Sequence, residues 1–370
     1  MFPDPGIYFD FPEDDYRSVP AFSASGCKDI MVSPLDFWSR SWMNKDRAEK
    51  QDSTARKLGS AYHKAILEGT EAFDAAYAVK PEPDEFAGLL RTGDELRAEC
   101  KSRSIKASGS LVEMAARIRQ DQAEKGEDQS QPPIWSEIME QWEAENEGKI
   151  DLTRAQWLEI RKAAYVIGRM DTVKNAFKGG MPEVSCFWFS DGVPMKARLD
   201  FLKPGTILDL KSFANIMQKE IIAAVAAEVA RNRYYIQPPI YCEAYDAMRA
   251  LYAKHGDAMA HGDFDPAWLK RAMAAERSRF VFIFQQSGDV PNCVPREFAM
   301  FESYGGQGRT TNAYWSLGAN CFAEGKRRYR HYLDHFGPDV PWVTDYKLAA
   351  FRDTDFPIFM LDQQVASEAA

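Results

Sequence analysis

The sequence lacks the features of membrane and secreted proteins. No apolar run approaches the roughly 20 residues that a bilayer-spanning helix needs. The first residues, Met1-Phe-Pro-Asp-Pro5, do not show the basic and then apolar pattern of a signal peptide. We therefore expect a soluble, cytoplasmic protein without a membrane partner.

Cysteines are few and scattered. The six cysteines, at positions 27, 100, 186, 242, 293 and 321, include no CxxC pair. Structural zinc sites and iron–sulfur clusters usually show clustered cysteines, so we expect neither cofactor. An isolated cysteine in an apolar run, such as Cys186, is typical of a reduced core residue.

Basic residues are in the minority. The 370 residues include 46 Lys and Arg against 55 Asp and Glu, which gives a formal net charge of −9. This balance argues against a protein that coats a polyanion with a uniformly basic surface, although it allows a nucleic-acid enzyme with a local basic cleft. With 45% hydrophobic residues, the chain is long enough for one elaborated domain or two.

Hydrophobic periodicity changes near the middle of the chain. Helical spacing covers residues 54–71, 89–122 (as two short helices) and 135–177, and the polar residues 123–133 predict a linker. Further along, alternating patterns predict strands over 183–189 and 195–202 around a Ser190-Asp-Gly turn, then a strand over 206–213. The remaining expected elements are helices 216–233, 237–251 and 311–336 and strands 280–286 and 294–301.

These elements predict an α/β (α+β) fold, with a mixed central sheet flanked by helices and a helical insertion. The expected organisation is a first part of the main domain (1–88), the insertion (89–122), a linker (123–134) and the rest of the core (135–370).

Three charged residues of the predicted sheet carry the chemistry. Asp209 and Lys211 alternate along one strand and therefore project to the same face, while Asp200 lies on the preceding strand beyond a short Pro-Gly turn. Carboxylates in such apolar surroundings are costly to bury unless a cation binds them, and Mg²⁺ is a suitable partner. The alternative is that Asp209 and Lys211 only pair with their neighbours at the end of a strand.

This arrangement resembles the PD-(D/E)xK nuclease superfamily, which implies a restriction-endonuclease-like core. Gly59-Ser-Ala-Tyr-His63 is similar to the Gly-x-x-x-His motif of the RecB/RecE-type branch, and Gln237-Pro-Pro-Ile-Tyr241 is similar to its Gln-x-x-x-Tyr motif. The segments Gly6-Ile-Tyr-Phe-Asp-Phe-Pro12 and Ser23-Ala-Ser-Gly26 resemble the start of RecE-like, exodeoxyribonuclease VIII-like phage proteins. The third motif position is Asp209 instead of the commoner Glu, and the clustered cysteines of the iron–sulfur relatives are absent.

The resemblance implies a metal site and a catalytic lysine. Metal ligands would be His63, Asp200, Asp209 and the carbonyl of Leu210. The catalytic residues would be Lys211, Asp209, Asp200 and Glu183, with Lys211 as the catalytic lysine. The expected cofactor is Mg²⁺, with Mn²⁺ able to substitute. A lone histidine on a helix is otherwise more often structural.

Three further residues are assigned by the same resemblance. Glu183 would be an upstream acid near the metal, although glutamate is also common where strands begin. Gln237 and Tyr241, at i and i+4, share a helix face and would contact the DNA backbone or a terminal nucleotide. The alternative for this pair is the ordinary start of an amphipathic helix.

The predicted insertion is locally basic. The segment from Arg91 to Arg119 contains seven basic and four acidic residues. Its two predicted helices joined by a short turn resemble a SAP-type helix-extension-helix DNA-binding motif. Lys101, Arg103 and Lys106 would then contact phosphates. The alternative is a helical hairpin that packs on the core and exposes a solvated face.

Taken together, the sequence predicts a Mg²⁺-dependent deoxyribonuclease. The RecE-like resemblance implies a 5′→3′ exonuclease that resects double-stranded ends and leaves 3′ strands for recombination by a RecT-like annealing protein, in a ring-shaped homo-oligomer. Two alternatives remain open, namely an endonuclease or nickase with the same metal centre, and a non-catalytic DNA-binding scaffold.

Overall fold

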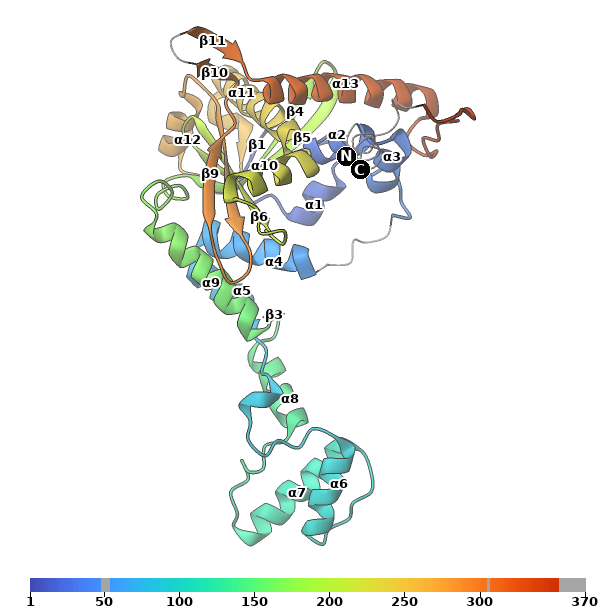
Figure 1. Cartoon of the computed structure of the whole chain (residues 1–370), viewed down its shortest axis with the longest axis vertical. Coiled ribbons are helices and arrows are strands. Elements are labelled where there is room, and N and C mark those ends of the chain that lie inside the picture. Colours follow the sequence, from blue (N-terminus) through green and yellow to red (C-terminus); the bar gives the residue numbers. More distant parts are fainter. Residues whose placement is uncertain (48–53, 305–306, 353–370) are drawn as a thin grey trace, which may run out of the picture.

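The computed structural model describes residues 1–47, 54–304 and 307–352, and its centre is a mixed seven-stranded sheet (Figure 1). The neighbouring pairs β1–β7 and β6–β8 are parallel, and the other pairs are antiparallel. In spatial order the strands are β7 (Ala260–His261), β1 (Gly6–Tyr8), β4 (Met181–Ser190), β5 (Val193–Lys203), β6 (Thr206–Phe213), β8 (Arg279–Gln286) and β9 (Cys293–Glu297).

Helices cover the sheet on both faces. The main core lies under α2 (Ala24–Ile30), α3 (Pro34–Arg40), α11 (Gln237–His255), α12 (Pro266–Met273) and α13 (Ala313–Phe336). A second core cluster joins the other face of the sheet to α9 (Arg154–Arg169) and to a π-helical turn, η1 (Lys64–Glu68). The remaining elements near the sheet are α1 (Glu13–Ser18), α4 (Thr54–His63), α5 (Thr70–Ala76), α10 (Ile221–Arg231), η3 (Tyr234–Ile236), η4 (Gly256–Met259) and the ribbon β10 (Phe301–Tyr304) and β11 (Gln307–Thr311). The predicted α/β class with a mixed, helix-flanked sheet is therefore confirmed.

The β4–β5 hairpin forms because the sequence supplies both its pattern and its turn. Asp191 and Gly192 both have positive φ, which a tight two-residue connection requires, and the strands pair from Ser190–Val193 back to Met181–Leu202. The buried side chains of this hairpin are mostly apolar. This rigid hairpin and β6 supply most of the acidic residues discussed below.

A helical arm projects from the sheet domain (Figure 1). The short parallel strands β2 (Tyr77–Val79) and β3 (Ile150–Leu152) pair at its base, and the arm contains η2 (Pro83–Glu85), α6 (Gly93–Ser102), α7 (Leu111–Lys125) and α8 (Trp135–Glu145). It has its own small core, to which Ile134 contributes. The insertion is thus longer than the predicted 89–122, and the predicted linker packs within it, because Gln122 Nε2 bonds the carbonyl of Asp128.

Two predicted helices have different bounds in the structure. The expected helix 135–177 is interrupted by β3, because the chain must return from the arm to the sheet domain there. The helix expected from residue 216 begins only at Ile221, after a loop. Within the described ranges, no helix combines the length and apolar character needed to cross a membrane.

Close packing of α13 against η3 gives a direct test of the fold. A Cβ atom on Gly318 would overlap the carbonyl oxygen of Tyr235, whereas a Cβ atom on Gly168 in α9 would meet nothing within 4 Å. We expect Gly318→Ala to lower stability by roughly 1–3 kcal/mol through overpacking. Gly168→Ala gains the same helix propensity without the overlap and should raise stability by up to about 1 kcal/mol. Thermal unfolding of both variants measures the difference, and equal shifts would contradict the packing.

Candidate active site

The strands β5 and β6 separate where Asp200 lies. Their ladder pairs Phe201 with Leu208 and continues only toward the turn. Beyond it, Asp200 Oδ2 accepts a hydrogen bond from the Leu210 N–H at 3.0 Å, so the carboxylate takes the place of a backbone partner. β6 remains straight because it continues to pair with β8 as far as Phe213. The two strands therefore open around an acidic side chain.

His63 reaches this opening from the end of α4. Its Nε2 lies 3.0 Å from the Leu210 carbonyl oxygen and 3.9 Å from Asp200 Oδ2. The helix continues as the π-helical turn η1 directly after His63, and such turns are frequent at functional sites. The structure thus brings together His63, Asp200 and Leu210, three of the four residues predicted as metal ligands.

Glu183 faces Asp200 across the β4–β5 pair. The residues on either side of Glu183 pair with the residues on either side of Asp200. Glu183 has a left-handed backbone with φ of 51°, which costs a non-glycine residue of order 1–3 kcal/mol. Burial, and then the charge of Asp200, raise the pKa of Glu183 to about 8. The strained backbone therefore holds the two carboxyl groups so close together that Glu183 keeps its proton more tightly than usual.

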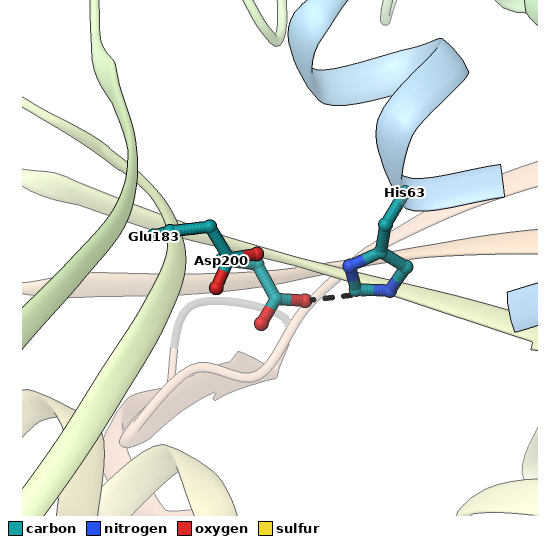
Figure 2. A group of neighbouring side chains, drawn as sticks. All are labelled: His63, Glu183 and Asp200. Atoms are coloured by element: carbon teal, nitrogen blue, oxygen red, sulfur yellow. Dashed lines mark ion pairs between the residues drawn. The ribbon is translucent and has the colours of Figure 1, made fainter. Parts of the chain in front are cut away.

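One ligand atom from each of His63, Glu183 and Asp200 lies within 4.8 Å of the other two. Figure 2 shows the carboxyl groups of Glu183 and Asp200 side by side, with the His63 ring on the far side of Asp200. The facing carboxylates repel each other, and a cation held by both removes that repulsion. Carboxylate oxygens, a main-chain carbonyl and an imidazole nitrogen are all donors that bind divalent cations in proteins. The residues present therefore fit a divalent metal.

Asp209 and Lys211 form a buried ion pair beside this group. Asp209 is fully buried, and its Oδ1 pairs with Lys211 Nζ while its Oδ2 accepts a hydrogen bond from Gln237 Nε2 at 3.1 Å. Burial acts to lower the pKa of Lys211, but the carboxylates of Asp209 and Asp200 outweigh it and the pKa is raised. Lys211 therefore keeps its proton at neutral pH. The role of Asp209 as a metal ligand stays a prediction.

The Gln-x-x-x-Tyr pair points into the site. Gln237 is only 7% exposed and its amide holds Asp209, so it orients that carboxylate, whereas the sequence led us to expect a contact with DNA. Tyr241, half-buried on the same helix, packs edge-on against Phe280. Burial, and then the charge of Asp209, raise the pKa of Tyr241 well above its usual value, so its hydroxyl stays protonated.

Two residues of the site, Lys28 and Tyr234, have no counterpart in the sequence prediction. Lys28 on α2 and Lys211 both lie over the ring of Tyr234, with Nζ at 4.7 Å and 5.3 Å from the ring centroid. Burial, and then the charge of Lys211, lower the pKa of Lys28 to about 8. In the described part of the chain, no carboxylate lies within ion-pairing distance of Lys28 Nζ. The only sequence feature near Lys28 that we had singled out was the Ser23-Ala-Ser-Gly26 segment before it.

The other residues predicted to contact DNA lie on the arm, and they differ in exposure and in existing ion pairs. Lys101 and Lys106 are exposed. Arg103 is half-buried and forms ion pairs with three carboxylates of the arm itself, those of Glu99, Asp121 and Glu127. Its charge is therefore already neutralised, which the count of basic residues in the sequence could not reveal.

The fold and this site define a protein of the PD-(D/E)xK nuclease superfamily. A family model described as "PDDEXK-like domain of unknown function (DUF3799)" matches residues 23–254, which is more than half of the chain and includes every residue of the site above. The chain belongs to this DUF3799 family.

Two other comparisons add little to this assignment. A crystal structure of a presumptive exonuclease from Eubacterium rectale is similar to this chain with a TM-score of 0.43 and 16% identity, over 87% of this chain and 84% of that one. A similarity of this level carries no information about substrate. No curated protein matches the sequence.

Proposed function

We propose that the protein is a Mg²⁺-dependent deoxyribonuclease that degrades double-stranded DNA from its ends. The observation that carries this proposal is the group of His63, Glu183 and Asp200 beside the Asp209–Lys211 ion pair. The group combines a divalent-metal donor set with a protonated lysine, a combination that supports phosphodiester hydrolysis. A protein that only binds DNA has no need for two repelling carboxylates on a strained backbone.

Each residue has a separate role in the proposed reaction. His63, Glu183, Asp200 and the Leu210 carbonyl would hold a divalent metal, which would supply polarisation of a phosphoryl oxygen and a lowered pKa of water. Lys211, which keeps its proton, stabilises the negative charge that grows on the phosphate, and Asp209 holds its Nζ in place. Gln237 in turn orients Asp209. Lys28 supplies a second cation on the side of Tyr234 for a phosphate of the same strand.

The finer assignment follows the RecE-like motif order. It is a 5′→3′ exonuclease that leaves 3′ strands for recombination, works with a RecT-like annealing protein and assembles as a ring. A ring threaded by DNA retains its substrate without a basic exterior, which is consistent with the net charge of −9. The exposed Lys101 and Lys106 of the arm give the DNA a further phosphate contact outside the site.

Cleavage of linear and circular DNA tests the proposal. A linear duplex is labelled separately at each 5′ end and internally, and a covalently closed circle of the same sequence serves as the control. We expect Mg²⁺-dependent release of nucleotides from the linear ends, no cleavage in EDTA and an intact circle. Nicks or cuts in the circle would instead make the protein an endonuclease. Binding without any cleavage would leave a DNA-binding scaffold.

The arm gives a second prediction. Replacing Lys101 and Lys106 by alanine should reduce the slope of log affinity against log salt by roughly 0.9 for each phosphate that the arm no longer neutralises. Arg103→Ala is the matched control, because its charge already pairs within the arm. It should leave the slope unchanged and lower the melting temperature. Titration of a labelled duplex at several salt concentrations in EDTA measures the slopes, and thermal unfolding measures the melting temperature. A larger change of slope from Arg103→Ala than from the Lys101 and Lys106 variant would contradict the assignment.

A further inference from the structure

The loop that follows the catalytic strand exposes two large apolar side chains. Ile216 and Met217 are 84% and 77% exposed. Isoleucine and methionine are among the residue types most often buried, and adjacent exposed ones mark interaction sites more than single ones do. The sequence pattern predicts a helix here, in which part of this apolar surface would be covered. The structure leaves both side chains in solvent.

The exposure is held in place by hydrogen bonds within the loop. Asn215 bridges the loop in both directions, because its Nδ2 donates to the Lys219 carbonyl at 2.8 Å and its Oδ1 accepts from the Lys219 N–H at 3.0 Å. The Gln218 N–H donates to the Asn215 carbonyl, and Gln218 has a positive φ of 48°. Only then does α10 begin, at Ile221. These bonds present the Ile216–Met217 tip as a defined projection.

The loop lies close to the candidate active site along the chain. Ile216 follows Lys211 by five residues, a span of at most about 17 Å even when fully extended. The base of the loop is anchored, since the Phe213 carbonyl accepts from the Ser287 N–H at 2.9 Å. β6 also contacts α4, the helix that carries His63 (Figure 1). The tip therefore lies close enough to Lys211 to meet a DNA strand that extends from the site on this side.

The size and type of the tip point to a base pair as its occupant. Each partner of a stable protein dimer buries about 800 Å², which is far more than two side chains supply. Isoleucine and methionine are instead among the residues that proteins insert between base steps to unstack them. Lys219, two residues after Met217, is exposed and offers a cation for the adjacent phosphate.

We propose that Ile216 and Met217 form a wedge that separates the terminal base pairs of duplex DNA and directs one strand to the metal site. The inference rests on the proposed nuclease function, since it specifies how a duplex end enters that site. The substrate class is therefore a paired end that must be opened before one strand can reach Lys211. A substrate that is already unpaired does not need the wedge.

The experiment compares Ile216→Ser/Met217→Ser with Val340→Ser/Val343→Ser, two exposed valines after α13 that are 51% and 57% exposed. A blunt duplex and a duplex with an unpaired fork are the cleavage substrates. A blunt duplex with 2-aminopurine in its terminal pairs reports base unstacking in EDTA. We expect the wedge variant to lose about tenfold or more in cleavage of the blunt duplex and to keep cleavage of the forked one within about twofold, as unstacking costs a few kcal/mol per step. Its 2-aminopurine signal should also fall, and the valine variant should match wild type.

Three results would overturn the wedge. Equal losses on blunt and forked substrates would show a general defect, and an unchanged 2-aminopurine signal would show that the loop does not touch the bases. Loss of self-association in the wedge variant, measured by sedimentation, would make the loop a subunit contact. The 2-aminopurine signal does not depend on cleavage. It therefore tests the wedge even if the wild type proves inactive, which would be a failure of the proposed nuclease function alone.

Discussion

Lys211→Ala is expected to reduce DNA cleavage by about 10²–10³-fold or more, the usual cost of removing one group that stabilises charge in a transition state. The pKa of Lys211 is raised by Asp209 and Asp200, so the lysine acts as a cation and its loss removes charge stabilisation. Binding of a duplex in EDTA should persist, because the phosphate contacts proposed for Lys28 and the arm do not involve Lys211. Single-turnover cleavage and binding titrations on the same substrate separate the two effects.

The variant also leaves Asp209 buried without its partner, which is itself destabilising by about 3–5 kcal/mol in typical buried pairs. A second variant, Asp209→Asn/Lys211→Met, removes both charges and should fold more stably than Lys211→Ala while remaining inactive. Lys28→Met is the matched lysine control, since it lies over the same Tyr234 ring but outside the ion pair. It should weaken binding and retain turnover at saturating DNA. Equal loss of binding and cleavage in Lys211→Ala would count against its catalytic role.

Asp200→Asn is expected to abolish the stabilisation that Mg²⁺ or Mn²⁺ gives to the wild-type protein. A ligand at a hundredfold excess over its Kd stabilises the folded state by about 2.7 kcal/mol, which is readily seen as a rise in melting temperature. The asparagine oxygen can still accept the Leu210 N–H, so the separated β5 and β6 strands keep their local structure. Thermal unfolding in EDTA, Mg²⁺ and Mn²⁺ measures the effect.

Two companion variants keep this prediction specific. Glu183→Gln removes the facing carboxylate of the same group and should also lose the metal-dependent shift. Asp191→Asn changes an aspartate at the far end of β4 that pairs with Lys326, and it should keep the shift. An undiminished shift in Asp200→Asn would remove Asp200 from the metal ligands, whatever its effect on cleavage.

Local sequence pattern was sufficient where neighbouring residues decide the structure. The strands that become β4, β5 and β6 follow from alternation and from the Asp-Gly and Pro-Gly turns between them. This places Asp200 and Lys211 on consecutive strands, and the alternation along β6 alone puts Asp209 and Lys211 on one face. The same reasoning failed at Ile216, where apolar residues suit a helix but the side-chain bonds of Asn215 and the left-handed Gln218 delay it.

Contacts between distant residues decided the rest. Lys28 meets Tyr234 only because α2 packs against η3, some two hundred residues later in the chain. Gln237 holds Asp209, because α11 packs against β4, β5 and β8 and leaves the Gln237 side chain little exposure. The pairing of β2 with β3 likewise sets the true length of the arm. No periodicity reports such pairs, since each depends on the relative position of whole elements.

Residue type, strand alternation and turn chemistry are local properties, and for that reason the amino-acid sequence was enough to select candidate residues for the chemistry. These are the acids, the lysine and the motif histidine, and the same properties indicated the α/β class. The protonation state and orientation of these side chains depend on the tertiary packing. Packing between elements produces three features, namely the separation of β5 from β6, the strained backbone of Glu183 and the burial of the Asp209–Lys211 pair. Together these features make the motif residues a site that fits a divalent metal.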